Sequence, residues 1–443
     1  MTMKDFFRKN KICIYSVLSV ILFLLPVART IYVESKNGLY LIDLAAYCDV
    51  SRALFKGCNP FPDHLETLVI MGQNDVPIVY PGQMALFALP GFLWGHAVQI
   101  GYLALNFAIV FFLTGLTLVK ACGYRWCDLR KPGWRQFVYA LCCFCFFSSA
   151  CVMNIMRLGQ IVLVLALCLY ALFWGPVSRW LRVVLFAFIA VTKYSVLPVV
   201  APLLFFKGRR KLCIAAFSLF VFLSVSPVFC GNDLAEVYGG YYQAIGVLFQ
   251  PGGVNHYDMS PLMCHFGFFK IPVVNHVLKA VAICMILWLF WHERKTRHFS
   301  DTLLLLALSL TMLISYHAIH DLALIFPLLF IRLFDFAKKK QWFFFWGTAI
   351  FPLYLMIPGN VILTVSSWIG GIRGIGSVVY LSNHPWGSRF QHVFPVTPFF
   401  SAALALWSLY LYFRVKNPYC FEIPESGPAG EMPPTVCPSG AAS

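Results

Sequence analysis

Residues 12–33 read ICIYSVLSVILFLLPVARTIYV, and this stretch decides the class of fold. A bilayer is crossed by about 20 mainly apolar residues, and the run is long enough for one crossing. Similar runs recur along the 443 residues, of which 60% are hydrophobic and 12% charged, with a mean hydropathy of +0.75. A soluble domain carries about 25% charged residues. The chain is therefore predicted to be an all-α polytopic membrane protein.

The positive charges indicate which side of the membrane each connection faces. The net charge is +16, and Lys and Arg concentrate in short segments between the apolar runs, namely 4–11, 120–135, 207–211, 293–298 and 338–340. This distribution is typical of cytoplasmic loops, so we expect both termini in the cytosol. The run 12–33 is too long for a cleaved signal peptide and should stay as an anchor. The sequence contains no basic groove with interleaved aromatic residues, so nucleic acid is not an expected partner.

Placing the basic segments inside the cell yields about twelve crossings, some of them short or broken. The spans assigned in this way are 12–33, 98–119, 137–153, 161–174, 183–206, 212–229, 276–291, 302–334, 343–356 and 396–413. Long outer loops follow at 34–81, 231–275 and 358–395. Residues 1–415 are expected to form one integral membrane module. The tail, 416–443, is rich in Pro, Gly and Ser and is predicted to be disordered.

Two runs carry basic residues at both ends, so neither can be a single crossing. They are 183–206 and 302–334, and each is predicted to be a pair of short helices that meet on the outer side. The breaks fall near Lys193 and at 316–321. Irregular backbone at membrane depth is tolerated where it lines a cavity or is buried in protein. Two breaks on the outer side therefore predict one cavity that opens outward.

The first outer loop contains six of the eighteen acidic residues of the chain. Residues 43–56 have a helical rhythm, which places Asp43, Tyr47, Val50 and Leu54 on one face of a helix along the membrane surface. The short run 82–96 is predicted to be a second interfacial helix. The Asp43 carboxylate has two interpretations from its spacing, either a general base or the N-cap of its helix.

Asp49 and Arg52 are interpreted as a solvated pair on the same helix. Two cations further along the chain also have two interpretations each. Arg157 stands where a span reaches the outer surface, and it either extends to lipid headgroups or binds a substrate phosphate. Lys193 interrupts an apolar run, where an unpaired Lys costs roughly 2.5–3.5 kcal/mol on insertion scales. It either faces the cavity and binds a phosphate or pairs with a structural acid.

His317, His320 and Asp321 are the residues with the most metal-like spacing. No third ligand of that kind is evident nearby, so a histidine that hydrogen-bonds a phosphate or sugar is preferred and no metal site is predicted. No phosphate-binding glycine loop is found, which argues against a soluble nucleotide-sugar donor. No resident cofactor is expected, and the need for a divalent metal stays open. Two cysteine pairs in outer loops, Cys48–Cys58 and Cys230–Cys264, also stay open as disulfides.

Several short motifs occur together in a fixed order along the chain. They are Asp43-x3-Tyr47, Gly57-x-Asn59-Pro60-Phe61, Tyr80-Pro81, Gly159-Gln160, Lys193 in its broken run, Asn255, and His320 shortly before Pro327. This set resembles glycosyltransferase family 87, within the GT-C superfamily of membrane transferases that use polyprenyl-phosphate sugars. The resemblance covers roughly residues 12–413. The chain departs from the family pattern at Gly82, where a second proline is frequent, and at Asp321, where a second histidine is common.

The resemblance implies a GT-C fold in the cell membrane and a transferase of cell-envelope glycan biosynthesis. The donor would be a polyprenyl-phosphate monosaccharide such as mannose or arabinose, and the acceptor a glycolipid or glycan on the extracytoplasmic side. Asp43 matches the catalytic aspartate, and inversion at the anomeric carbon is expected. Lys193, Arg157 and His320 would hold the donor phosphate. The residues expected to contact substrates are Tyr47, Asn59, Tyr80, Gln160, Asn255 and His317.

Three rival functions remain at this point, one of which is a non-catalytic membrane receptor or scaffold. A flippase or other transporter of lipid-linked saccharides would need a polar path across both leaflets, whereas the polar residues within the apolar runs lie towards the outer side. A polymerase or ligase would use a diphosphate-linked glycan and would not depend on an early acid at the membrane surface.

Overall fold

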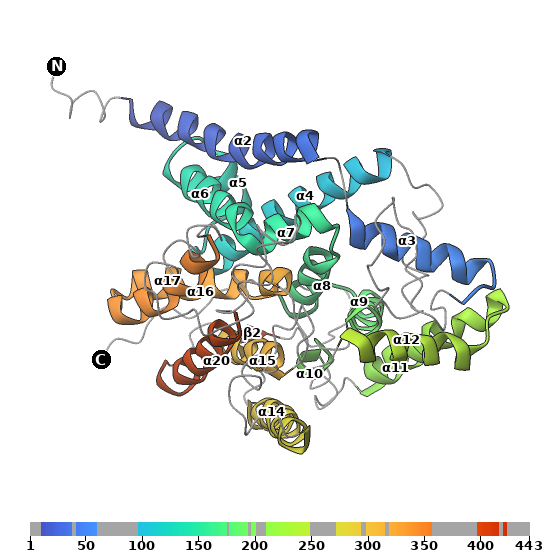
Figure 1. Ribbon diagram of the computed structural model, residues 1–443. Coiled ribbons are helices and arrows are strands. Elements are labelled where there is room, and N and C mark those ends of the chain that lie inside the picture. Colours follow the sequence, from blue (N-terminus) through green and yellow to red (C-terminus); the bar gives the residue numbers. More distant parts are fainter. Residues whose placement is uncertain are drawn as a thin grey trace, which may run out of the picture.

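The computed structural model describes residues 10–37, 41–59, 96–174, 177–193, 196–200, 210–248, 272–293, 298–314, 319–356, 397–415 and 420–422. Within these ranges the chain is almost entirely helical, which confirms the all-α prediction (Figure 1). One small antiparallel sheet is the exception. Figure 1 shows α2 along one edge of the molecule and α14 along the opposite edge, with α8, α15 and α16 between them.

The elements follow in chain order. The first half contains α2 (Lys11–Asn37), α3 (Ile42–Phe55), α4 (His96–Cys122), α5 (Trp126–Arg130), α6 (Trp134–Ser148), α7 (Ala150–Leu158), α8 (Val162–Trp174), α9 (Arg179–Thr192) and α10 (Leu197–Val200). The second half contains α11 (Arg210–Val225), the 3-10 helix η5 (Ser226–Cys230), α12 (Leu234–Leu248), α14 (Pro272–Glu293), β1 (His298–Ser300), α15 (Asp301–Ile314), the 3-10 helix η8 (Ile319–Leu324), α16 (Phe326–Lys338), α17 (Trp342–Met356), α20 (Thr397–Arg414) and β2 (Cys420–Glu422).

Several helices have the length and composition of membrane spans. In the described part of the chain, segments of α2, α4 and α14 are each long and apolar enough to cross a bilayer. The count rises to five if each of two sharply bent helix pairs is taken as one span. Further apolar helices, among them α8, α15 and α17, are shorter. The total of about twelve crossings stays a prediction from the charge pattern.

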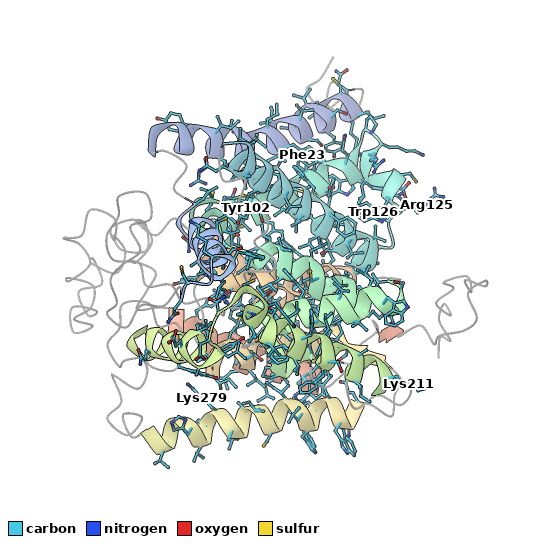
Figure 2. All side chains as sticks on the ribbon, turned by 90° about the vertical axis from the view of Figure 1, so that its right-hand side faces the viewer. Phe23, Tyr102, Arg125, Trp126, Lys211 and Lys279 are labelled. Carbon is cyan, nitrogen blue, oxygen red and sulfur yellow. The ribbon has the colours of Figure 1, made fainter. Side chains whose placement is uncertain are left out.

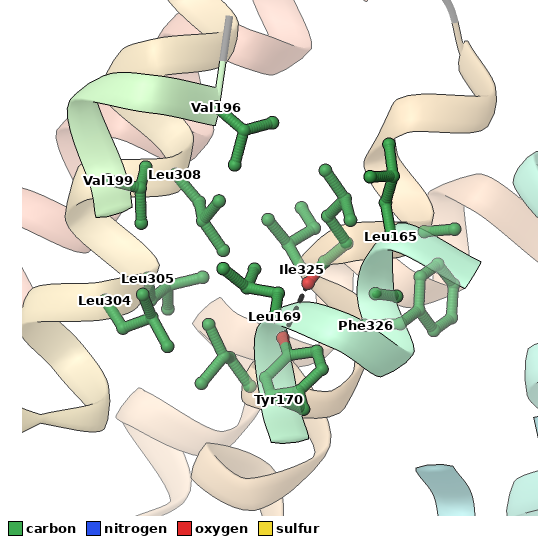
Figure 3. Close-up of a cluster of buried hydrophobic side chains, with 14 of the residues drawn as sticks. Leu165, Leu169, Tyr170, Val196, Val199, Leu304, Leu305, Leu308, Ile325 and Phe326 are labelled. Atoms are coloured by element: carbon green, nitrogen blue, oxygen red, sulfur yellow. Dashed lines mark hydrogen bonds between the residues drawn. The ribbon is translucent and has the colours of Figure 1, made fainter. Parts of the chain in front are cut away.

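The centre of the bundle is formed by α8, α10, α15 and the start of α16. Figure 3 shows Leu169 of α8 facing Leu305 of α15, and Leu165 of α8 and Val199 of α10 belong to the same apolar cluster. The hydroxyl of Tyr170 donates a hydrogen bond to the carbonyl oxygen of Leu324 at 2.5 Å. A buried phenol needs such a partner. The bond also fixes the end of η8 against α8.

The ends of several helices identify two opposite faces of the bundle. The ring of Tyr15, near the start of α2, lies 5.5 Å from that of Trp134 at the start of α6. The Nζ of Lys338 donates to the carbonyl oxygen of Ala121 at 3.1 Å. Figure 2 places Arg125 and Lys211 on one side of the molecule and Tyr102 and Lys279 on the other. Four of the basic stretches therefore share one face, which we call the basic face: the start of α2, 120–135, Lys211 and 338–340.

A small charged turn closes the connection between α4 and α6 on this basic face. The backbone N–H of Arg125 donates to Oδ2 of Asp128 at 3.2 Å, and Nη1 of Arg135 lies 2.8 Å from the same oxygen. The backbone hydrogen bond and, after it, the Arg135 guanidinium lower the pKa of Asp128. The acid is therefore charged at neutral pH and holds the turn.

The structure confirms both predicted helix breaks. Helix α9 ends at Thr192 with Lys193 as its C-cap, and α10 follows. Helix α15 ends at Ile314, and η8 begins at Ile319. The predicted interfacial helix at 82–96 lies outside the described residues, apart from His96.

Other elements differ from the predictions. The span expected at 137–153 is bent by 68° where α6 gives way to α7, because Ser149 caps α7. The loop expected at 231–275 begins with α12, which follows a bend of 111° after α11 and η5. Residues 420–422, in the tail predicted to be disordered, form β2 and pair antiparallel with β1. Cys48 and Cys58 are not joined by a disulfide, and Cys264 lies outside the described residues.

Candidate functional site

Helix α3 carries the predicted general base. It begins at Ile42, so Asp43 is in the first turn and Leu41 precedes the helix; this position does not favour the N-cap interpretation. Tyr47, Val50 and Leu54 are buried, with exposed fractions of 4%, 0% and 1%. The helical rhythm read from the sequence therefore identifies the buried face of α3. The Asp43 side chain is not among the described ones.

A glycine at the end of α7 lets the first turn of α3 approach closely. Gly159 ends α7 in the left-handed region, with φ +81°. A Cβ atom at this position would lie 2.7 Å from Cβ and 3.0 Å from the backbone nitrogen of Leu44. Glycine adopts this backbone conformation without strain, and it has no side chain to collide with Leu44. The residue next to Asp43 is therefore in direct contact with the end of α7.

Gln160 joins three helices at the same place. The hydroxyl of Tyr47, on α3, donates to Oε1 of Gln160 at 3.4 Å. The hydroxyl of Tyr102, on α4, donates to the backbone oxygen of Gln160 at 2.5 Å. Gln160 is buried, with 8% of its surface exposed. Two of the predicted substrate-binding residues, Tyr47 and Gln160, are thus brought together next to Asp43.

A second polar group lies where the two broken runs meet. The ammonium of Lys193 forms an ion pair with Oδ1 of Asp321. Nε2 of His320 lies 3.7 Å from the same oxygen, and its other ring nitrogen, Nδ1, lies 3.5 Å from Nδ2 of Asn154. We call these four residues the lysine cluster. The structural acid that the sequence left open as a partner of Lys193 is Asp321.

The members of the lysine cluster differ in exposure. The side chain of Asp321 is completely buried, that of His320 is 9% exposed, and that of Lys193 is 20% exposed. A buried carboxylate is stable only with a partner of opposite charge and further polar contacts. Lys193 and His320 supply these and retain some exposed surface. The cation and the imidazole are therefore the accessible part of the cluster.

Helix α7 connects the lysine cluster to α3. Asn154 belongs to the cluster, and Gly159 contacts Leu44. These two residues are five positions apart, a helical rise of about 7.5 Å. Arg157 lies between them in the backbone, and its side chain is outside the described set. Helix α7 thus contacts the first turn of α3 at its end and contributes Asn154 to the lysine cluster.

Other predicted residues lie elsewhere. Nδ2 of Asn59 donates to the carbonyl oxygen of Glu236 on α12 at 3.4 Å, so Asn59 helps to hold the far end of α3. Tyr80, Asn255 and His317 lie outside the described residues. Among the residues that the structure does describe, no group of three His, Cys, Asp or Glu side chains is arranged to hold a metal ion.

Three features of this region were not predicted from the sequence, namely the roles of Asn154 and Tyr102 and the pairing of Asp321 with Lys193. Asn154 has a signal, because it is a lone amide in the apolar stretch CVMNI at 151–155. The pairing of Asp321 with Lys193 has a weaker signal in the sequence. A lysine within the membrane requires a counter-charge, but 128 positions separate the two residues. Tyr102 has no signal, because aromatic residues are common in such spans.

Comparison with known proteins identifies the family. No curated protein and no solved structure matches the chain. The family model for glycosyltransferase family 87 matches residues 79–315, more than half of the 443. The match includes Arg157, Gln160 and Lys193; it begins after Asp43 and ends before His320. The chain therefore belongs to glycosyltransferase family 87 and is a multi-pass membrane glycosyltransferase.

Proposed function

We propose that this glycosyltransferase moves one monosaccharide, mannose or another hexose or pentose, from a polyprenyl-phosphate donor to a glycolipid or glycan. The transfer takes place on the extracytoplasmic side of the cell membrane, in a GT-C type of fold. The observation that carries the proposal is the arrangement along α7. One end of this helix contacts the turn that contains Asp43, and Asn154 in its middle contacts the lysine cluster.

Asp43 acts as the general base in this mechanism. Its carboxylate accepts the proton of the attacking acceptor hydroxyl while the hydroxyl oxygen bonds to the anomeric carbon. The bond from that carbon to the donor phosphate breaks, and its electron pair leaves with the phosphate. One displacement inverts the anomeric configuration. The two carboxyl groups of most glycosidases are unnecessary because the phosphate is already a good leaving group.

The leaving phosphate is bound by cations and hydrogen-bond donors. Lys193 and His320 are the accessible members of the lysine cluster, and Arg157 on α7 is a third ligand. Hydrogen bonds between charged partners are roughly twice as strong as neutral ones, and fixed donors stabilise charge that develops during the reaction. Tyr47 and Gln160 shape the space beside Asp43. The remaining proposed substrate contacts are Asn59, Tyr80, Asn255 and His317, and the mechanism requires no resident cofactor.

The test is transfer by the purified protein in lipid nanodiscs. Polyprenyl-phosphate mannose and arabinose, each labelled in the sugar, are supplied with a membrane glycolipid extract, and label in new glycolipid or glycan is measured. The proposal expects product from a monophosphate donor. Product only from a diphosphate-linked glycan would identify a polymerase or ligase instead. Movement of labelled donor between the leaflets of sealed proteoliposomes, without a new bond, would identify a flippase.

The role of the base is tested by Asp43→Asn. A positioned general base contributes about 100-fold to 10,000-fold in rate, so the variant should lose at least about 100-fold in kcat while it folds normally. Asp49→Asn, on the same helix, is the matched control and should keep normal turnover. Near-normal turnover by Asp43→Asn would show that another group takes the proton.

A further inference from the structure

One oxygen atom of Asp321 is shared by two neighbours. Oδ1 contacts the ammonium of Lys193 and lies 3.7 Å from Nε2 of His320. Lys193 comes from the end of α9, whereas His320 and Asp321 come from η8. The carboxylate thus links the lysine head to the imidazole.

The backbone that carries Asp321 is held firmly. Leu322, Ala323 and Leu324, which follow it, have exposed fractions of 2%, 0% and 1%. The Tyr170 hydroxyl binds the Leu324 carbonyl (Figure 3), and the ring of Phe326 stacks on Phe146 with centroids 4.9 Å apart. A carboxylate on such a support keeps a fixed position. A lysine side chain, in contrast, is long and flexible, and its ammonium is defined only by its partner.

We propose that Asp321 is a positioning residue for the donor phosphate. It holds the Lys193 ammonium beside the His320 imidazole, so that both face the same phosphate. Asn154 contacts Nδ1 of the ring, and Nε2, which at 3.7 Å from Asp321 is beyond hydrogen-bond distance, donates to the phosphate. An ammonium has three N–H donors, so its bond to Asp321 leaves donors for a phosphate. The inference rests on the proposed function, because it assigns the phosphate of the lipid donor as the ligand.

The rival interpretation is that the pair only neutralises a charge inside the membrane. The two interpretations differ in what happens when both partners are replaced by uncharged residues. Lys193→Met with Asp321→Asn removes both charges, so the stability of the wild type should return under either interpretation. Only under the positioning role does donor binding stay impaired, because the phosphate has lost its cation.

The experiment measures thermal stability, kcat and KM for the labelled donor in nanodiscs. Loss of an outer-shell partner typically weakens a site by about tenfold to 100-fold, so Asp321→Asn should raise KM for the donor at least about tenfold. Asp321→Glu should recover part of this loss. The double variant Lys193→Met/Asp321→Asn should regain stability and keep the raised KM. Asn154→Leu should raise KM in the same direction.

The matched control is a second buried acid with a lysine partner. Asp335, whose side chain is 3% exposed, pairs with Lys339 at 3.0 Å on the basic face. Asp335→Asn should lower stability and leave KM unchanged. An unchanged KM in Asp321→Asn, or a double variant with normal KM, would overturn the positioning role. Wild-type protein that transfers nothing from any monophosphate donor would instead overturn the proposed function, and the inference with it.

Discussion

Gly159 is the residue that brings α3 to the end of α7. Its φ is +81°, and a Cβ atom there would lie 2.7 Å from Cβ of Leu44. Each of these two facts alone disfavours any other residue. We expect Gly159→Ala to lower the free energy of unfolding by about 2–4 kcal/mol, from backbone strain and overpacking together. Thermal unfolding followed by circular dichroism in nanodiscs measures this change.

The same substitution elsewhere provides the control. Gly101 lies within α4 and is exposed, and nothing within 4 Å would meet a Cβ there. Gly101→Ala should be neutral or stabilising by up to about 1 kcal/mol, because alanine favours a helix. If Gly159→Ala melts as high as Gly101→Ala, α3 does not dock on α7 as described.

The lysine cluster shows how far residue types alone can identify a site. The isolated Lys193 in an apolar run and the polar break at 316–321 could be found in the sequence, because each violates the composition of its surroundings. The partnership of Lys193 with Asp321 could not, since it depends on how α9 and η8 pack. Asn154 joins the cluster from a third element for the same reason.

At the scale of elements, the bend between α6 and α7 depends on one serine. Oγ of Ser149 accepts the backbone N–H of Val152 at 3.4 Å and donates to the carbonyl oxygen of Phe146 at 2.6 Å. The residue is completely buried. Ser149→Ala should therefore cost about 1–2 kcal/mol of stability, because the buried N–H of Val152 loses its cap, whereas the Phe146 carbonyl keeps the backbone N–H of residue 149.

Ser178 is the matched helix cap. It starts α9 and accepts from the N–H of Leu181 at 3.3 Å, but it is exposed. Water can replace its hydroxyl, so Ser178→Ala should cost about 0.5 kcal/mol, the lower end for helix caps. Chemical or thermal unfolding measures the loss of stability in both variants. A larger loss of stability in Ser178→Ala than in Ser149→Ala would show that the buried cap at the bend is not the stronger of the two.

The other end of α3 is held by a buried amide. Nδ2 of Asn232, just before α12, donates to the carbonyl oxygen of Leu54 at 2.7 Å and to that of Pro227 at 3.0 Å. Asn232→Ala should lower stability by about 1–3 kcal/mol, because two buried carbonyl groups lose a donor. Asn59→Ala, which removes one exposed bond of 3.4 Å, should change the melting temperature much less. Equal shifts in melting temperature for the two variants would show that Asn232 does not hold α3 more strongly than Asn59 does.

The success of the sequence in locating elements follows from hydrophobicity. Long apolar runs correspond to α2, α4, α8, α14, α17 and α20, whose ends fall within a few residues of the predictions. The bend at Ser149 was missed because the residues around it stay apolar throughout. Helix α12 was not predicted because residues 231–275 were assigned to an outer loop, and its two central glycines, Gly239 and Gly240, are unfavourable in a helix.

At the scale of the whole molecule, two exposed cysteines report the orientation. Cys58 follows α3, and Cys127 lies in α5 on the basic face. In intact cells a membrane-impermeant maleimide should label Cys58, and Cys127 should be labelled only after permeabilisation. Mass spectrometry of the labelled peptides, with Cys58→Ser and Cys127→Ser as references, identifies each site. Label on both residues in intact cells would contradict the proposed orientation.

The position of α2 affects how the enzyme can be isolated. Only 11% of its apolar window is buried, and Phe23 contacts the bundle through the rings of Phe111 and Tyr139. A harsh detergent competes for this small buried surface, so we expect α2 to detach from the bundle before the other helices, and α3, which follows it in the chain, to lose activity-relevant support on that side. The remaining helices would stay folded. A solubilised preparation can thus keep a sharp melting curve after its turnover has gone.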